Sequence, residues 1–311
     1  MNVLIAGCGY VGSALAEVLV RGGHRVWGLR RDPRGLPEGV IPVAADLSSP
    51  ASLEPLEDAI DHLVYAASPA ERTQAAYEAV YLRGLESVLA ILERRARLAR
   101  VVLTSSTAVY AQDDGGWVDE RSPTEPTGFS GRTILAAESL LDGRPFRGVA
   151  LRLAGIYGPG RTWLVRRVHH GAERSDGRPT PAAVRRGRDA VTQRSDPNDR
   201  GEARTDPRTI RYGNRIHRDD CAGALAHLLA LPDPCAVYLG VDDAPAPLAE
   251  VYAYVAALLG VAPPPEGASD EGRGGNKRCK NARLLASGYA LSVPSYREGY
   301  PPIVGAYLRG A

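Results

Sequence analysis

The chain has 311 residues, more than one hydrophobic core usually holds, so its length favours a main domain with a smaller appended lobe. Its 38 lysines and arginines nearly balance 36 aspartates and glutamates. The formal net charge of +2 therefore argues against nucleic acid or an anionic membrane as a partner. Met1 is followed at once by the apolar run NVLIAG, and the chain has no apolar run of about 18 residues, so we expect a cytoplasmic protein.

The four cysteines are widely scattered and lack the C-x-x-C spacing that is typical of zinc sites. In a chain expected in the cytoplasm they do not suggest a disulfide framework either. We therefore expect no metal site, and small, semi-buried roles for Cys8, Cys221, Cys235 and Cys279.

Short apolar runs alternate along the chain with longer stretches of helical period, as expected when crossover helices join parallel strands. This pattern predicts an α/β fold. We expect helices at 12–21, 70–95 and 131–141, and Gly22-Gly23 supplies a stop for the first of them. We expect strands at residues 2–6, 25–29, 40–44, 62–66, 101–105 and 148–153.

From Gly171 to about Thr209 the sequence becomes a mixture of Arg, Asp, Pro, Gly, Ser and Thr with almost no apolar periodicity. Such a stretch cannot bury enough surface to order itself, which predicts a flexible insertion at 171–208. A lid or an anion clamp is the alternative interpretation, and we assign the stretch no site residues. We predict a dinucleotide-binding domain over 1–154, to which 215–241 returns, and a capping lobe over 155–214 and 242–311.

Regular structure resumes after the insertion at NRIHRDDCAGALAHLLAL, which we interpret as a strand followed by a helix. Asp219 or Asp220 can cap that helix, because an aspartate side chain accepts hydrogen bonds from the first free amides. Near the end of the chain, Asn281 precedes ARLLAS and Gly288 follows it, which predicts one more helix with a matched cap and stop.

The first expected strand runs directly into GCGYVG and then a helix, which is the context that a G-x-G-x-x-G motif needs. Its first glycine permits a tight turn, its second lets the backbone approach a pyrophosphate, and its third allows the helix to pack closely on the strand. The positive end of the helix dipole attracts the phosphate charge. We therefore predict that a dinucleotide contacts Gly7, Gly9, Tyr10, Val11 and Gly12.

The end of the second expected strand indicates which dinucleotide is bound. NAD-binding folds tend to carry an acid there, about twenty residues after the glycine loop, which binds the ribose 2′-OH. Here Arg30 and Arg31 stand at this place, and a guanidinium pairs with a 2′-phosphate instead. NADP(H) is favoured over NAD(H). After the third strand come Asp46 and Leu47, where Asp46 accepts a hydrogen bond from the adenine amino group or, alternatively, caps a helix.

These residues resemble the short-chain dehydrogenase/reductase superfamily, in its extended branch of NAD(P)-dependent epimerases and dehydratases. The matching motifs are GCGYVG, ADL, DHLVYAAS, VVLTSSTAVY, LRLAGIYGPG and NRIHRDDCAGAL, in the family's order. The resemblance implies a Rossmann-type, doubly wound parallel sheet with a smaller C-terminal lobe that caps the substrate. It also implies that Ala66 and Ala67 line the nicotinamide side of the cofactor, and that Ser106 is the catalytic hydroxyl.

The family's acid/base pair is missing from this sequence. The family uses a tyrosine, with a lysine four residues later that lowers its pKa, because a phenol of pKa about 10 is a poor base at neutral pH. Here the segment reads Ser130-Gly131-Arg132-Thr133-Ile134-Leu135-Ala136-Ala137-Glu138. Ser130 therefore replaces the tyrosine and Ile134 replaces the lysine, and neither supplies a base or a charge.

Other residues are candidates for an improvised acid. They are Tyr110, Tyr157 and His217, with Arg132 as a charge partner, and for each of them a structural role is an open alternative. We place Ser106 and Tyr157 first, because the family's geometry puts both neighbourhoods beside the nicotinamide.

The resemblance also bears on substrate and assembly. A small-molecule substrate with an anionic group would suit Asn276-Lys277-Arg278 and Arg283, although solvated charges explain these residues equally well. Family members often dimerise through helices equivalent to 70–95 and 131–141, which implies a homodimer. Tyr289, Tyr296 and Tyr300 pack the lobe or line its pocket.

Two functions fit these observations. The first is an NADP(H)-dependent oxidoreductase or nucleotide-sugar-epimerase-like enzyme whose active site lacks the Tyr/Lys pair. The second is a non-catalytic NADP(H)-binding sensor or scaffold, which the loss of that pair would permit. Hydride transfer itself needs only a positioned nicotinamide and a polarised acceptor, so a rearranged active site is compatible with the first function.

Overall fold

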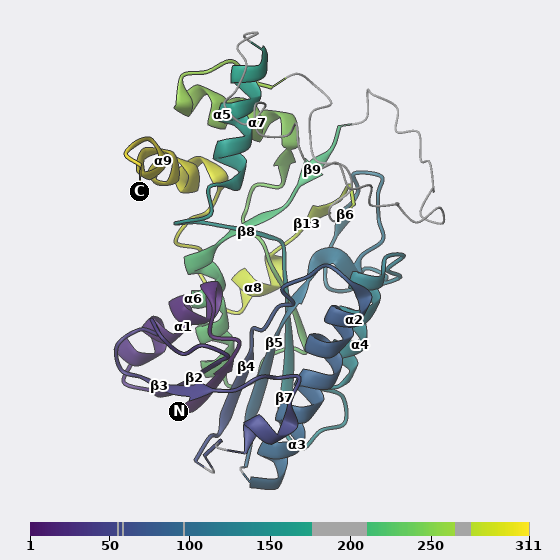
Figure 1. Ribbon diagram of the computed structural model, residues 1–311. Helices are drawn as coiled ribbons and strands as arrows, with labels where there is room; N and C mark the ends of the chain where they lie inside the picture. Colours follow the sequence, from purple (N-terminus) through teal and green to yellow (C-terminus); the bar gives the residue numbers. More distant parts are fainter. Residues whose placement is uncertain (55, 58, 96, 176–209, 265–274, 311) are drawn as a thin grey trace, which may run out of the picture.

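A parallel sheet forms the centre of the computed structural model, which describes residues 1–311 except 55, 58, 96, 176–209, 265–274 and 311 (Figure 1). The sheet has seven strands in the order β3-β2-β1-β4-β5-β7-β11, which is the doubly wound Rossmann arrangement. The strands are Asn2–Ala6 (β1), Arg25–Arg30 (β2), Val40–Ala44 (β3), His62–Tyr65 (β4), Arg100–Ser106 (β5), Arg147–Leu153 (β7) and Val237–Gly240 (β11).

The sequence prediction of the fold class is confirmed. Every expected strand is present with ends that shift by at most one residue, and all the neighbouring pairs of the sheet are parallel. The sequence did not single out β11, which pairs with β7 at the edge of the sheet. β11 therefore brings the chain back to the sheet, after the segment between Leu153 and Val237.

Helices cover both faces of the sheet, which is why its central strands are apolar on both sides. Tyr10–Arg21 (α1) and Arg218–Ala230 (α6) bury one face, and the other face is buried under Leu85–Arg95 (α3) and Phe129–Ser139 (α4). The helix expected over 70–95 begins instead at Gln74–Tyr77 (α2), where Thr73 caps it. It continues to α3 through a π-helical stretch, Glu78–Gly84 (η2).

Two expected caps differ from the prediction. α6 is capped by His217, whose Nδ1 accepts a hydrogen bond from the Asp219 amide at 3.3 Å, so neither Asp219 nor Asp220 caps it. Both aspartates lie in the first turn instead. Ala282–Ala286 (α8) begins after Asn281 as predicted, but the Asn281 amide donates to the carbonyl of Val241 and does not cap the helix.

A lobe with its own apolar core lies beyond the carboxyl ends of the strands (Figure 1). Its helices are Trp163–Ser175 (α5), Leu248–Leu259 (α7) and Tyr296–Leu308 (α9). Three short pairs link it to the sheet: Gly155–Tyr157 (β8) with Arg215–His217 (β10), Tyr212–Gly213 (β9) with Ala246–Pro247 (β12), and Trp117–Val118 (β6) with Arg278–Cys279 (β13). Short 3-10 turns occur at Pro50–Leu53 (η1) and Thr107–Val109 (η3).

The predicted insertion at 171–208 only partly falls within the described residues. Residues 171–175 still belong to α5, so the change in composition at Gly171 does not end that helix. Residues 176–208 lie outside the described residues. None of the helices in the described part of the chain is long and apolar enough to cross a membrane.

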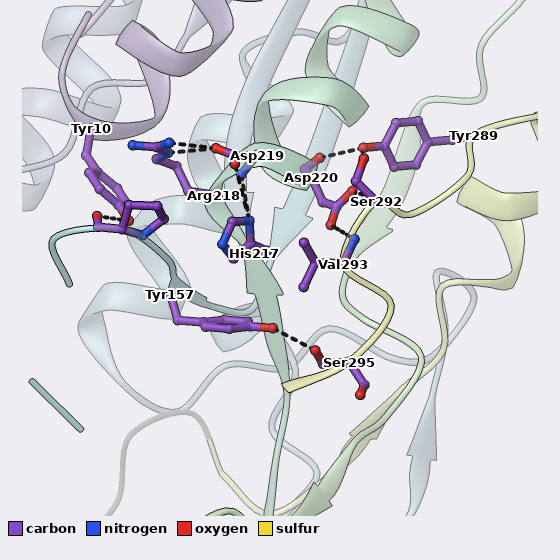
Figure 2. A network of polar contacts seen from close by, with 11 residues as sticks. Tyr10, Tyr157, His217, Arg218, Asp219, Asp220, Tyr289, Ser292, Val293 and Ser295 are labelled. Atoms are coloured by element: carbon purple, nitrogen blue, oxygen red, sulfur yellow. Dashed lines mark hydrogen bonds and ion pairs between the residues drawn. The ribbon is translucent and has the colours of Figure 1, made fainter. Parts of the chain in front are cut away.

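Asp220, in the first turn of α6, links the lobe to the sheet (Figure 2). The fully buried Asp220 carboxylate accepts hydrogen bonds from the Tyr289 hydroxyl and from the amides of Ser292 and Val293 at 2.7–3.0 Å. These three partners belong to the segment that leads into α9. A charge without solvent is stabilised by such donors, so Asp220 fixes the path of this segment.

Candidate functional site

The glycine loop between β1 and α1 is held mainly by backbone hydrogen bonds. The amides of Gly7 and Cys8 both donate to the carbonyl of Leu29, the penultimate residue of β2, at 3.0 Å. Gly7 has φ +89°, and a Cβ added there would overlap the backbone of Ala67. The Ala66 amide donates to the Ala6 carbonyl at 2.8 Å. The loop therefore lies between the ends of β2 and β4, with Ala66 and Ala67 beside it, and contact of these two residues with a nicotinamide stays a prediction.

The middle of the loop leaves room for a phosphate. Gly9 is exposed, and a Cβ added there would have only the Gly7 carbonyl oxygen within reach, at 4.0 Å. No side chain caps α1 and no acidic residue lies in its first turn, so the first amides of this helix are available to an anion. A Cβ at Gly12 would lie 2.7 Å from the same carbonyl oxygen, which explains the third glycine. Val11 packs against the core beneath.

Tyr10 joins the loop to the chain after β8 (Figure 2). Its hydroxyl donates to the Pro159 carbonyl at 2.9 Å. The guanidinium of Arg161 lies 4.2 Å from the centre of the Tyr10 ring, and that of Arg218 lies 5.4 Å from it. Arg218 is paired with Asp219 at 2.8 Å, whereas Arg161 has no carboxylate partner among the described residues and donates to the Ile156 carbonyl. A cation without a counter-charge thus stands at the start of α1.

Arg161 was not among the residues that the sequence singled out. It is 151 positions from Tyr10, and only the folding of β8 back toward the glycine loop brings the two together. The G-P-G run before it indicates a turn but says nothing of what that turn approaches.

Arg30 ends β2, one residue after the carbonyl that holds the glycine loop. It is half-buried, and the next residue, Arg31, is exposed. The one acid that follows in this turn, Asp32, is bound by the Arg34 guanidinium at 2.6 Å, which holds the pKa of that carboxyl below its usual range. The end of β2 therefore presents cations and no unengaged carboxylate to a ribose.

Asp46 does not have the helix-capping role that was one of the two alternatives for it. Its carboxylate accepts from the Ser48 hydroxyl at 2.7 Å and from the Ser48 amide at 2.9 Å, and these bonds lower its pKa. It does not cap a helix, because the nearby 3-10 turn Pro50–Leu53 starts after Ser49. Leu47 packs against the core under the second face of the sheet. Contact of Asp46 and Leu47 with a cofactor stays a prediction.

A cleft of about 1000 Å³ lies between the carboxyl ends of the strands and the lobe. This is where ligands bind in open α/β sheets. Ser106 and Tyr157, the two predicted catalytic residues, both line it, as do Ser130 and Ile134. The structure thus brings the four positions together, although they come from β5, β8 and α4.

The hydroxyl groups of the two predicted catalytic residues already have partners. Ser106 Oγ accepts from the Ala108 amide at 3.1 Å, which leaves its own proton available. The Tyr157 hydroxyl donates to the Ser295 carbonyl at 3.1 Å (Figure 2), and its ring stacks on Tyr300 with centres 5.0 Å apart. Burial raises the pKa of Tyr157 well above its usual range. Catalysis by either residue stays a prediction.

The other candidates have structural roles outside the cleft. Tyr110 is buried, and its hydroxyl accepts from Arg152 at 2.8 Å. Burial raises its pKa to about 12. His217 caps α6, and burial lowers its pKa. The expected charge partner Arg132 is exposed and donates to the carbonyl of Thr127. None of these three candidates lines the cleft.

The basic residues that were candidates for binding an anionic substrate form hydrogen bonds within the protein instead. Lys277 is buried and donates to the Tyr110 carbonyl at 3.0 Å. Arg278 donates to the Gly115 carbonyl, and Arg283 donates to a carbonyl of β11. Among the described residues, the cleft is lined by a different set of cations and by one acid, Glu71. These cations are Arg72, Arg161, Arg166, Arg211 and Arg215. They are far apart in the sequence, which is why no local pattern revealed them.

Comparison with known proteins places this site in context. A model of the NAD dependent epimerase/dehydratase family matches residues 3–190. Protein YeeZ of Escherichia coli strain K12 is 29% identical over 284 residues, which cover 88% of this chain and 89% of YeeZ. A candidate NAD-dependent epimerase/dehydratase from Methylobacillus flagellatus is 34% identical, with a TM-score of 0.73 over 99% of this chain and 98% of that one. MoeE5, solved with UDP-glucuronic acid and NAD, is 22% identical with a TM-score of 0.75 over 100% of both chains, and shares the fold.

Proposed function

The chain belongs to the NAD-dependent epimerase/dehydratase family, and we propose that it is an NADP(H)-dependent oxidoreductase or epimerase-like enzyme acting on a small anionic molecule. The observation that carries this proposal is the glycine loop. Its backbone is open above Gly9, the first turn of α1 is uncapped, and Arg161 adds a cation without a counter-charge at the same place. These features suit a pyrophosphate.

The preference for NADP(H) rests on the end of β2. Arg30 offers a guanidinium where an NAD-binding protein offers an acid, and Asp32 is held by Arg34. A 2′-phosphate would gain a charge-assisted hydrogen bond from Arg30, whereas a free 2′-OH would find no acceptor there.

A bound nicotinamide supplies hydride transfer, and the residues of the chain bind and orient its partner. Five arginines and one glutamate line the cleft within the described part of the chain, so an anionic substrate would gain favourable charge interactions there. Arg215 is the most buried of these cations, 8% exposed, and its surroundings would strengthen a pairing with an anion.

A non-catalytic sensor or scaffold is the second candidate function. Ser130 and Ile134 favour it, because they line the cleft where the family carries its tyrosine and lysine and they supply no base and no charge. Under this function the cofactor binds but passes no hydride to a substrate.

Transfer of isotope from labelled cofactor distinguishes the two functions. NADPH deuterated at C4, in both the pro-R and the pro-S form, is incubated with the protein and a metabolite extract, and products are screened by mass spectrometry. We expect deuterium in at least one product with the wild type and none with Gly7→Ala, whose loop cannot keep its conformation. Binding of NADPH without any transfer of deuterium would favour the sensor.

A further inference from the structure

Reduction of a carbonyl needs a proton donor in the cleft. A hydride that reaches the carbonyl carbon leaves negative charge on the oxygen, and a general acid typically accelerates such a step by about 10²- to 10⁴-fold. Neither Ser130 nor Ile134 supplies a suitable acid, while a tyrosine hydroxyl is protonated at neutral pH. The tyrosines that line the described cleft are Tyr77, Tyr157, Tyr212, Tyr252 and Tyr300.

The lobe engages three of these tyrosines. The Tyr157 hydroxyl donates to the Ser295 carbonyl. Tyr300 is buried in the core of the lobe, and its ring stacks on Tyr157. Tyr252 is buried in the core of the lobe. All three stand on the far side of the cleft from α4.

Tyr212 is also remote from α4. It lies on β9, and its ring is stacked on the Arg278 guanidinium at 4.7 Å. Its backbone amide is bound by the Asn276 side chain at 2.8 Å. These contacts place Tyr212 with the β6 and β13 pair, at the side of the cleft.

Tyr77 is the tyrosine beside the two positions that lost the family's pair. It is the last residue of α2, and α2 lies next to α4 (Figure 1). Its ring meets the edge of Phe129, the residue before Ser130, with centres 5.4 Å apart. It also packs against the small apolar cluster that contains Ile134. Tyr77 therefore approaches the same part of the cleft from a neighbouring helix.

The Tyr77 hydroxyl is available for chemistry. Tyr77 is half-buried and lines the cleft together with Ser106, and its hydroxyl forms no hydrogen bond among the described residues. The ring, in contrast, is fixed between Phe129 and Tyr81, whose centre lies 5.5 Å away. A rigid ring that carries an unengaged hydroxyl into a ligand cleft is suited to proton transfer.

We propose that Tyr77 is the proton donor of the reaction, an inference that rests on the proposed function. In the reductive direction, NADPH supplies a hydride with its electron pair, a C–H bond forms at the substrate carbonyl carbon, and the C=O π pair moves to oxygen. That oxygen takes the proton of Tyr77 Oη, which gives an alcohol and NADP⁺. Tyr77 regains a proton from water in the cleft.

Tyr77→Phe tests the proposal, because it removes the hydroxyl and keeps the ring that packs on Phe129. Tyr81→Phe is the matched control: Tyr81 belongs to the same ring stack, does not line the cleft, and has a pKa that burial raises to about 12. Deuterium transfer from NADPH in a metabolite extract and calorimetric affinity for NADPH are measured for the wild type and both variants. We expect transfer to fall by about 100-fold or more in Tyr77→Phe and by less than about twofold in Tyr81→Phe.

Two readouts do not depend on turnover. Affinity for NADPH should stay within about twofold in Tyr77→Phe, since no binding contact is lost. Nitration of the wild type by tetranitromethane, followed by peptide mapping, should modify Tyr77 in the free protein and much less when NADPH fills the cleft. Equal nitration of Tyr77 with and without NADPH overturns the proposal.

The same measurements distinguish a failure of this proposal from a failure of the proposed function. If the wild type transfers deuterium and Tyr77→Phe does so equally, the enzyme stands and Tyr77 is not its donor. Loss of transfer in Tyr157→Phe instead would assign the proton to Tyr157. A parallel loss of NADPH affinity in Tyr77→Phe would assign Tyr77 a structural role. If the wild type binds NADPH but transfers no deuterium, the proposed function fails and this proposal fails with it.

Discussion

The glycine loop and the wall of the cleft formed by α4 both lie at the carboxyl ends of the strands. They differ in what determines their function: backbone geometry in the loop, and side-chain identity in the α4 wall. The loop depends on backbone geometry, through positive φ at Gly7 and two amides that share one carbonyl of β2. The α4 wall carries Ser130 and Ile134 at the two positions where the resemblance in sequence implies a tyrosine and a lysine. Cofactor binding and chemistry are thus separable, because a side chain in a cleft can change without disturbing the fold.

The largest effect that would test this comparison is expected from Gly7→Ala. The added Cβ would overlap the Ala67 backbone and would also need φ near +89°, so the loop must shift. We expect affinity for NADPH to fall by about 100-fold or more, with a loss of thermal stability, as measured by calorimetry and by thermal unfolding.

Gly143→Ala is the control for that substitution. Gly143 also has positive φ, at +66°, but a Cβ there meets nothing within 4 Å. It should cost roughly 1 kcal/mol of stability and leave affinity for NADPH unchanged. Equal losses of affinity in the two variants would mean that the loop geometry is not what binds the cofactor.

The next largest effect concerns stability on the lobe side of the cleft. Asp242 is buried, its Oδ2 has no hydrogen-bond partner within the described structure, and burial raises its pKa to about 7 despite nearby Arg215. Because the folded-state pKa lies above the unfolded one, the neutral carboxyl favours the folded state at low pH. That contribution is lost as the pH rises through about 7.

Asp242→Asn should remove this dependence. Between pH 5 and pH 8 we expect the stability of the variant relative to the wild type to rise by about 2 kcal/mol, as measured by urea unfolding at each pH. A stability difference that stays constant over this range would show that Asp242 is ionised throughout. Affinity for NADPH should not follow this pH dependence, because Asp242 lies on the lobe side of the cleft and the glycine loop binds the cofactor by backbone geometry.

Replacement of Arg30 by Asp should reverse the cofactor preference. The new carboxylate repels a 2′-phosphate and accepts a hydrogen bond from a 2′-OH, so the ratio of the NADPH and NADH dissociation constants should change by roughly 10- to 100-fold. Arg94→Asp makes the same change of charge on an exposed residue at the end of α3 and should leave the ratio unchanged. An unaltered preference in Arg30→Asp would mean that Arg30 does not contact the adenosine ribose.

The smallest of these effects is expected from Arg161→Gln. It removes the cation at the start of α1, so NADPH affinity should fall by roughly fivefold to tenfold and depend less on salt. Arg166→Gln removes another cleft arginine that does not stack on Tyr10, and it should change cofactor affinity by less than about twofold. Equal losses would point to the overall charge of the cleft instead of a specific contact.

The sequence predicted the parts of this molecule that depend on local patterns. Alternating apolar runs located six strands of the sheet, and the glycine motif located the loop that Gly7 holds in place. The cap of α6 was assigned wrongly, because several polar residues stood together and the choice of His217 depends on where Asp220 is engaged. The cytoplasmic location and the homodimer stay predictions.

The cleft was less accessible to sequence reasoning. Tyr77 and Arg161 carry no motif of their own, and they meet Phe129 and Tyr10 only through packing of helices and loops that are distant in the chain. Lys277, by contrast, seemed suited to an anion in the sequence but is buried against the Tyr110 carbonyl. Local chemistry indicates which side chains can bind, and tertiary structure decides which of them face a ligand.

The central proposal is that the glycine loop binds a dinucleotide although the α4 wall carries Ser130 and Ile134 where the resemblance implies a tyrosine and a lysine. Titration of the wild type with NADPH and with NADH, by calorimetry at a single ionic strength, tests it most directly. We predict micromolar affinity for NADPH and at least about tenfold weaker affinity for NADH. If neither dinucleotide binds, the glycine loop has the conformation of a dinucleotide site but does not bind one, and the proposed enzymatic function is contradicted.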